Sequence, residues 1–288
     1  MRNYGLKIAA FVMCGGMLFA QNNSSSVEQE GNGNVAMVGQ VGNSNTSEVD
    51  QHGEMHGGLG LNNEAYVMQM GNNNESSITQ AGDLNASIVA QLGNNNSATV
   101  DIGVGWAEKN ESVIYQEGNG NTASQLIRWD KNRAAIRQVG NNNLAVQDQR
   151  TGEDKKLGNE AYADQLGNRN EISQTQLGKR NFLGAEQEGN SNYAEQYQEG
   201  NRNGAGSSQT GNNNVTGQWQ MGNGNFAGAV QLGNRNQAYQ VQMGNNNLSL
   251  SYQEGNNNLS GSMQMGNGHT AVSTQLGNGN MALHMQSN

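Results

Sequence analysis

Polar and apolar residues follow one repeating unit from residue 23 to residue 286. Each unit is a seven-residue segment that opens with Asn and closes with Gln, followed by a four-residue turn rich in Gly and Asn. There are 23 segments; Asn opens 22 of them and Gln closes 21. Seven residues between glycine-rich turns are too few for a typical helix and suit a β-strand. The pattern therefore predicts an all-β chain of 23 strand–turn units.

Within each segment, positions one, three, five and seven share one face, because alternate side chains of a strand point the same way. These positions carry no Asp, Glu, Lys, Arg, Phe, Tyr or Trp. Strand charges such as Glu48 and Arg133, and strand aromatics such as Tyr66 and Trp219, fall only at positions two, four or six. The alternation predicts strands with one face turned away from water.

The fifth position indicates how many strands form one coil. Val or Ile occupies it in the first eight segments, from Val27 to Ile114. From Gln125 to Ser251, Gln alternates there with Ile, Ala or Ser, so the period is two strands, or 22 residues. The predicted fold is a β-solenoid with two strands per 22-residue coil, whose alternate strands form two stacked parallel sheets, as in amyloid.

The predicted interior is polar, since 118 of the 288 residues are Asn, Gln or Gly, which excludes a conventional aliphatic core. A buried amide without a partner costs roughly 1–3 kcal/mol. Identical amides stacked in successive coils pair donor with acceptor, so they can replace the missing core. We expect this structural ladder to include Asn34, Gln40, Asn74, Gln80, Asn170, Gln176, Asn192, Gln198, Asn214, Gln220, Asn236, Gln242, Asn258 and Gln264.

Glycines in the turns permit a tight reversal that other residues resist. The turn positions that we single out are Gly31, Gly42, Gly71, Gly93, Gly167, Gly189, Gly211, Gly233, Gly255 and Gly277. Three turn insertions, at 52–62, 103–109 and 150–158, add seven, three and five residues. Loops tolerate such additions and paired strands do not, which supports the assignment of segments and turns.

Residues 1–20 differ from the rest: Arg2 and Lys7 precede a mostly apolar stretch that ends at Ala20. This is typical of a secretory signal peptide, which leaves a mature chain of residues 21–288. Cys14 is the one cysteine, so the exported chain has no disulfide. Loss of two basic residues changes the net charge from −9 to −11, which argues against nucleic acid and anionic membranes as partners. We expect no direct membrane insertion.

The unit Gln-x-Gly-x-x-Asn-x-Ala-x-x-x-Gln, as at Gln29, Gly31, Asn34, Ala36 and Gln40, resembles the curlin repeat over nearly the whole mature chain. The resemblance implies a secreted bacterial subunit that self-assembles into curli, the amyloid fibres of the biofilm matrix. It also implies adhesion, a surface nucleator subunit and an outer-membrane secretion pore as partners. Familiar curlins alternate Ser-opened with Asn-opened strands and carry a longer leader, so the sequence leaves open whether this chain is the major subunit or the nucleator.

Both terminal strands lie near the ends of the predicted mature chain, so we expect terminal coils with unpaired backbone groups that template another copy. A rival interpretation is a monomeric β-solenoid adhesin that binds glycan through its outward aromatics. Nothing in the sequence indicates an enzyme or a cofactor.

Several polar side chains allow either a functional or a purely structural interpretation. Asp50, His52, Glu54 and His56 alternate as metal ligands can, but we favour a polar turn and predict no metal site. His269 and His284 occupy inward positions of the last two strands. A further set of basic residues is expected in turns at one end of the strands, to contact anionic polysaccharide or only solvent: Arg169, Lys179, Arg180, Arg202 and Arg235.

Overall fold

The computed structural model describes residues 22–52, 61–103, 107–152 and 157–288, and these ranges form 23 β-strands and no helix. The predicted signal peptide and the central parts of the three insertions lie outside the described residues. Among the described residues no helix is long and apolar enough to cross a bilayer.

The strands follow one another at the spacing predicted from the sequence. They are β1 (Ser24–Gln29), β2 (Val35–Val41), β3 (Thr46–His52), β4 (Glu64–Asn72), β5 (Glu75–Ala81), β6 (Ala86–Asn94), β7 (Ser97–Ile102), β8 (Glu111–Asn119), β9 (Thr122–Arg128), β10 (Arg133–Asn141), β11 (Leu144–Arg150), β12 (Glu160–Asn168), β13 (Glu171–Lys179), β14 (Phe182–Asn190), β15 (Tyr193–Asn201), β16 (Gly204–Asn212), β17 (Val215–Asn223), β18 (Phe226–Leu232), β19 (Gln237–Asn245), β20 (Leu248–Glu254), β21 (Leu259–Asn267), β22 (Thr270–Leu276) and β23 (Met281–Ser287).

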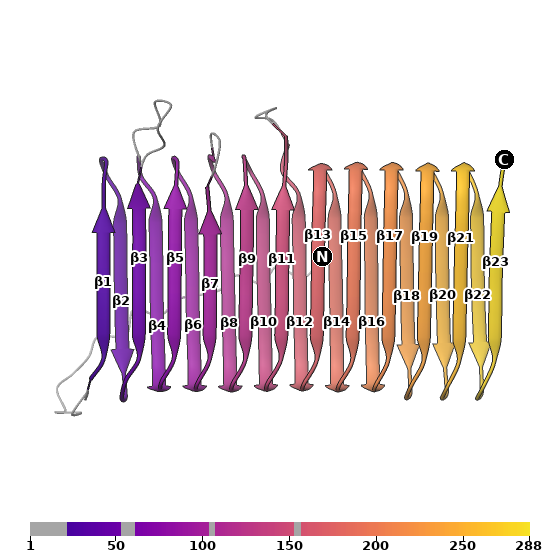
Figure 1. Cartoon of the computed structure of the whole chain (residues 1–288), viewed down its shortest axis with the longest axis horizontal. Coiled ribbons are helices and arrows are strands. Elements are labelled where there is room, and N and C mark those ends of the chain that lie inside the picture. The colour runs from indigo at the N-terminus through magenta and orange to yellow at the C-terminus, as the bar shows by residue number, and fades with distance from the viewer. Residues whose placement is uncertain (1–21, 53–60, 104–106, 153–156) are drawn as a thin grey trace.

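Alternate strands form two parallel sheets. The odd-numbered strands make a 12-stranded sheet and the even-numbered strands an 11-stranded sheet, each in chain order. Tyr193 pairs with Val215 and Gly204 with Phe226, so the register advances 22 residues per coil in both sheets wherever no insertion intervenes. The result is a rod in which the chain crosses from one sheet to the other at every turn (Figure 1). The predicted two-strand β-solenoid is confirmed.

The interior holds the four positions predicted to face inward, and it changes along the rod. The third position is buried from β3 to β22, and it is Ala or Ser except at Ile172, Leu183 and Thr216. In the early coils the fifth position adds an aliphatic column, which includes Val49, Ile78 and Val100 in one sheet and Val67, Val89 and Ile114 in the other. Farther along, amides take over at this position in the odd-numbered strands.

The turns lie on two opposite edges of the rod, one after the odd-numbered strands and one after the even-numbered strands (Figure 1). The three insertions follow β3, β7 and β11, so all of them are on the same edge. The basic turn residues, in contrast, do not share one end as expected. Arg169 and Arg235 follow even-numbered strands, whereas Lys179, Arg180 and Arg202 lie on the opposite edge, because neighbouring units alternate direction.

Candidate assembly site: amide ladders and turn glycines

The even-numbered strands contain an unbroken ladder of glutamine side chains. In each step Nε2 of one Gln donates to Oε1 of the Gln in the next coil, at 2.8–3.1 Å. The members are Gln40, Gln69, Gln91, Gln116, Gln138, Gln165, Gln187, Gln209, Gln231, Gln253 and Gln275. All donors point toward the C-terminal end, so the ladder has a direction.

The second hydrogen of each amide crosses the core. Nε2 of Gln91 also donates to the carbonyl oxygen of Glu75 at 2.8 Å, and Nε2 of Gln187 to that of Glu171 at 3.0 Å. Each interior Gln therefore joins two coils of its own sheet and one strand of the facing sheet. This fills both donor positions of the amide, which is the condition for burying it at low cost.

The ladder of the odd-numbered strands has one interruption. It runs from Gln29 through Gln51 to Gln80, stops at Ile102 and Ile127, and resumes from Gln149 to Gln286. At the first side of the gap, Nε2 of Gln80 donates instead to Oγ of Ser87 at 2.8 Å. At the other side, buried Oε1 of Gln149 has no hydrogen-bond partner among the described residues.

A third ladder occupies the fifth position, from Gln125 to Gln240, with bonds of 2.7–2.9 Å. Hydroxyl groups close both of its ends. Oγ of Ser112 donates to Oε1 of Gln125, and Nε2 of Gln240 donates to Oγ of Ser249 at 2.9 Å. A serine hydroxyl can donate or accept, so it can terminate a directional amide ladder from either side.

The asparagines that open the strands also stack, though not as simple amide pairs. Oδ1 of Asn192 accepts the backbone N–H of Asn214 at 3.0 Å, while Nδ2 of Asn192 donates to the carbonyl oxygen of Gly211 at 2.8 Å. The amide-to-amide contact from Asn192 to Asn170 is longer, at 3.2 Å. Each inward Asn therefore binds the backbone at the start of the corresponding strand in the next coil. It also binds the carbonyl group of a turn glycine at the end of a strand in the facing sheet.

Of the predicted ladder residues, twelve are buried and bonded in this way, and Asn34 and Gln40 are partly exposed because they belong to the second strand. All of them face the interior. The glycine carbonyls that receive the asparagine amides were not foreseen, because their direction depends on the turn conformation.

Two features of the turn require glycine. Gly71, Gly93 and Gly189 have φ of 122°, 120° and 120°, a region that residues with a Cβ rarely adopt. The glycines also stack directly, so a Cβ at Gly189 would fall on the carbonyl of Gly211, far inside van der Waals contact. The turn glycines therefore set the spacing between coils as well as the turn itself.

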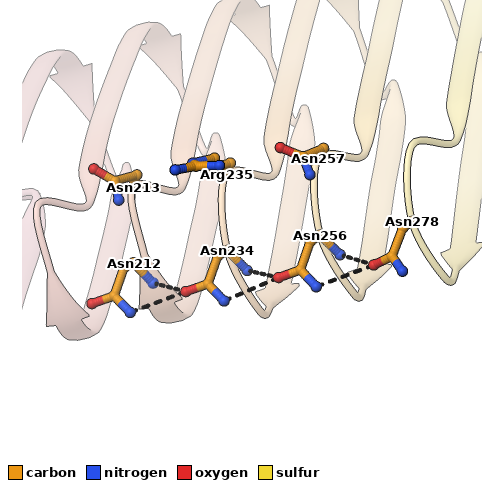
Figure 2. Close-up of a pocket in the computed structure, with 7 residues that line it drawn as sticks. All are labelled: Asn212, Asn213, Asn234, Arg235, Asn256, Asn257 and Asn278. Atoms are coloured by element: carbon orange, nitrogen blue, oxygen red, sulfur yellow. Dashed lines mark hydrogen bonds between the residues drawn. The ribbon is translucent and has the colours of Figure 1, made fainter.

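A fourth kind of ladder runs along the outside of the turns. Nδ2 and the backbone N–H of Asn212 both donate to Oδ1 of Asn234 at 3.0 Å, and the same pair of bonds joins Asn234 to Asn256. Figure 2 shows this row beside Arg235, lining a shallow polar hollow on the edge of the rod. The amides there bond to each other, so the hollow offers no obvious catalytic group.

Outward aromatic residues are divided between the two faces. Tyr193, Tyr197, Trp219 and Tyr239 lie on the odd-numbered sheet, and the even-numbered sheet carries Tyr66, Tyr115, Tyr162, Phe182, Phe226 and Tyr252. Several tyrosines donate to a nearby glutamate, for example Tyr197 to Glu199 at 2.9 Å. Burial is the main cause, and this hydrogen bond the second, of a raised pKa for the Tyr197 phenol.

The structure describes two of the four polar groups considered as metal ligands. Nδ1 of His52 lies 3.0 Å from Oδ1 of Asp50, and Glu54 and His56 lie outside the described residues. The described part of the chain contains no cluster of three His, Cys, Asp or Glu residues suited to a metal ion. Near the C-terminal end, Nε2 of His269 contacts the carbonyl oxygen of Met265 at 3.0 Å.

Comparison with known families agrees with the resemblance seen in the sequence. The family model described as the curlin associated repeat matches residues 20–53, 59–82 and 71–101. These ranges include β1 to β6 and most of β7, and the later strands repeat the same ladder and turn positions. A search of curated proteins finds no match. The chain therefore carries curlin repeats.

Proposed function

We propose that this chain, which carries curlin repeats, is a secreted structural subunit that self-assembles into curli-like amyloid fibres outside the cell. In that role it contributes to the biofilm matrix and to adhesion. Curlin proteins form a structural family and not an enzymatic one, and the described residues suggest no catalytic centre. The repeat and the β-solenoid fold support the proposal.

The observation that carries the proposal is the state of the two ends of the rod. β1 and β2 end the two sheets on one side, and β22 and β23 end them on the other. Each of these strands has a hydrogen-bonded neighbour on one side only among the described strands. An exposed edge that continues the register of a parallel sheet is a template for pairing with another chain. A second copy offers the same ladders at the same positions.

Within this proposal the main partner is a copy of the same chain, and a nucleator subunit and an outer-membrane secretion pore act before the fibre grows. We favour the major subunit over the nucleator because the unbroken glutamine ladder of the even-numbered strands suits repeated addition. The adhesin alternative needs an aromatic platform on one face. The division of the ten strand aromatics between two opposite faces weakens it.

The test uses the mature chain, residues 21–288, diluted from denaturant at neutral pH. Thioflavin fluorescence is followed with and without sonicated seeds, and the products are imaged by electron microscopy. We expect a lag that seeds abolish and unbranched fibres. A β-rich solution that stays monomeric for days, with or without seeds, would contradict the proposal.

A matched pair of variants tests whether the ends are used. Met285 lies in the terminal strand β23 and is 79% exposed. Met285→Pro removes a backbone donor from that strand and places a ring in the direction of pairing. It should lower the elongation rate on parent seeds at least tenfold, whereas Met285→Ala should stay near the parent rate. Equal rates for the two variants would mean that growth does not use this end.

A further inference from the structure

The two ends of the rod are offset by half a coil. β1 and β23 belong to the same 12-stranded sheet, so at each end the odd-numbered sheet extends one strand beyond the even-numbered sheet. If β1 of an incoming copy paired with β23, β22 and the incoming β2 would face each other across one empty strand position. That gap would leave backbone groups and the amides of Gln275 and Gln40 unpaired in the interior, at roughly 1–3 kcal/mol each.

Odd-numbered and even-numbered strands make the same hydrogen bonds at their opening Asn and closing Gln. Gln198 in β15 donates to the carbonyl oxygen of Phe182 at 3.0 Å, and Gln209 in β16 donates to that of Tyr193 at 2.9 Å, with the same separation of 16 residues. Asn192 and Asn203 likewise donate to the glycine carbonyl 19 residues ahead, both at 2.8 Å. The 11-residue unit therefore repeats after half a turn about the rod axis.

We propose that successive copies join head to tail with a half-turn rotation, so that the two sheets exchange at every junction. β1 of the incoming copy then pairs with β22, and its β2 pairs with β23. The rise of one strand per unit continues, and the junction is a normal coil broken only between the end of one chain and the start of the next. This inference rests on the proposed fibre function and specifies its subunit contact.

Outward side chains give an independent reason for the exchange. On β17, β19, β21 and β23 the outward positions carry no charged residue and are rich in Met, Leu, Val, Trp and Tyr. In the terminal strand, Met281, Leu283 and Met285 are 65%, 61% and 79% exposed. An exposed, uncharged sheet face of this extent is typical of an interaction surface.

The matching face lies at the other end of the rod and on the other sheet. The outward positions of β2, β4 and β6 include Val35, Met37, Met68 and Met70, which are 41–61% exposed, and they carry one charge, Glu64. The exchanged junction places β2 directly after β23, so the two apolar faces become one continuous surface. Apolar side chains that lie directly opposite each other on neighbouring strands pack together and stabilise the sheet.

On the opposite face the exchange sets two hydroxyl residues of β22 opposite polar residues of β1, whereas Val272 meets Ser26. Thr270 of β22 meets Ser24, which already pairs with Thr46 within its own sheet, and Thr274 meets Glu28. Without the exchange, Glu28 would meet Met285. The exchanged arrangement therefore keeps the Glu28 carboxylate beside a hydroxyl and places Met285 opposite Gly39, on the apolar face of β2.

The direction of the amide ladders adds the head-to-tail order. At the C-terminal end, Nε2 of Gln275 and of Gln286 each make one bond, to the carbonyl oxygens of Leu259 and Thr270, which leaves a second N–H in each. At the N-terminal end, Oε1 of Gln29 and of Gln40 receives no donor from the described residues. Donors thus face acceptors only when unlike ends meet.

Cysteine pairs distinguish the two arrangements, because the mature chain has no cysteine of its own. Leu283 meets Met37 if the sheets exchange and Ser26 if they do not. The variants are Leu283→Cys/Met37→Cys and the matched Leu283→Cys/Ser26→Cys. Within one copy the paired cysteines lie about 50 Å apart at ~4.8 Å per strand spacing, so a short reagent links them only between copies.

Fibres of each variant, confirmed by electron microscopy, are treated with a short bifunctional thiol reagent, dissolved in denaturant and resolved by size. We expect covalent multimers from the Met37 variant in at least tenfold greater yield than from the Ser26 variant. Leu283→Cys and Met37→Cys alone control for links between neighbouring fibres. Multimers mainly from the Ser26 variant, or from neither variant in well-formed fibres, would overturn the exchanged junction.

A failure of the proposed function looks different, since the parent chain would then form no fibres at all. If the parent forms fibres and the Met37 variant does not, a second set replaces it. Met281→Cys is combined with Val35→Cys or with Ser24→Cys, one position pair away on the same strands. The yields of covalent multimers from these two variants then show which arrangement the fibre has.

Discussion

Replacing one glutamine in the middle of a ladder tests whether the buried amides act as a connected row. Gln198 is fully buried, accepts from Gln176 at 3.2 Å, and donates to Gln220 at 2.7 Å and to the carbonyl oxygen of Phe182 at 3.0 Å. Gln198→Ile leaves three polar groups without this partner, at about 1–3 kcal/mol each. Burial of the isoleucine returns about 1.5–3 kcal/mol. We expect a net loss of about 3 kcal/mol.

The double variant Gln198→Ile/Gln220→Ile should cost little more than the single one. The row is then cut at Gln176 and at the next member beyond the pair, so the number of severed ends stays at two. The chain already contains such a pair, since Ile102 and Ile127 stack in neighbouring coils. We therefore expect the double variant to be about 2–3 kcal/mol more stable than the sum of two single losses, within the range known for coupled sites.

The assay is the concentration of soluble chain at equilibrium with seeded fibres, in a fixed denaturant concentration that keeps released chains unfolded. A loss of 3 kcal/mol raises that concentration about a hundredfold, at a factor of ten per 1.4 kcal/mol. Gln237→Ile, an exposed position on β19, is the matched control and should change it less than tenfold. Additive losses in the double variant would refute the connected row.

Two further predictions follow from the turns and from the outer faces. Gly189→Ala should cost at least 3 kcal/mol in the same assay because its φ is 120° and the added Cβ meets the next turn, whereas Gly206→Ala, with open space at its Cβ and no positive φ, should be nearly neutral. The pKa of Tyr197 is raised by burial and then by Glu199, so its contribution to stability is present below the ordinary phenol pKa and disappears as the pH rises through the raised value. A difference titration of tyrosinate absorbance against Tyr197→Phe should show a midpoint above 10, lower in Glu199→Gln; no change in that variant would contradict the assigned hydrogen bond.

The fold could be predicted from the sequence because a polar core makes strict demands on it. An amide ladder works only if the same residue recurs in register, so the pattern that stabilises the coil is visible in the letters themselves. The inward positions from β3 to β22, the period of two strands and the parallel pairing are confirmed. A globular core of mixed aliphatic residues produces no such repeat in the sequence, since many different packing arrangements are compatible with the same composition.

Other parts of the site were within reach of the sequence but were missed. The insertions follow the third, seventh and eleventh segments, and segments of equal parity share an edge, so counting alone places all three together. The same count places Arg169 and Arg180 on opposite edges of the rod, because they follow segments of unequal parity. By contrast, the serine hydroxyls of Ser112 and Ser249 at the ends of the inner ladder could not be found this way. Serine occupies the third position in many coils, and only the geometry shows which hydroxyl meets a ladder end.

Two of the three insertions lie beside the gap in the glutamine ladder of the odd-numbered strands. The second insertion directly follows Ile102, and the third directly follows Gln149, whose Oε1 is unpaired. Aliphatic contacts are nondirectional and tolerate a small shift of the backbone, whereas an amide bond weakens steeply once its distance or angle changes. From Gln165 to the end of the chain the spacing never changes and every segment closes with Gln. The first insertion follows Gln51, whose bond to Gln80 is intact at 2.7 Å, in a coil whose fifth position is aliphatic. Length irregularity is therefore found only in coils that have an aliphatic fifth position or a cut ladder. The regular half of the rod is the half whose terminal strand we propose as the acceptor of the next copy.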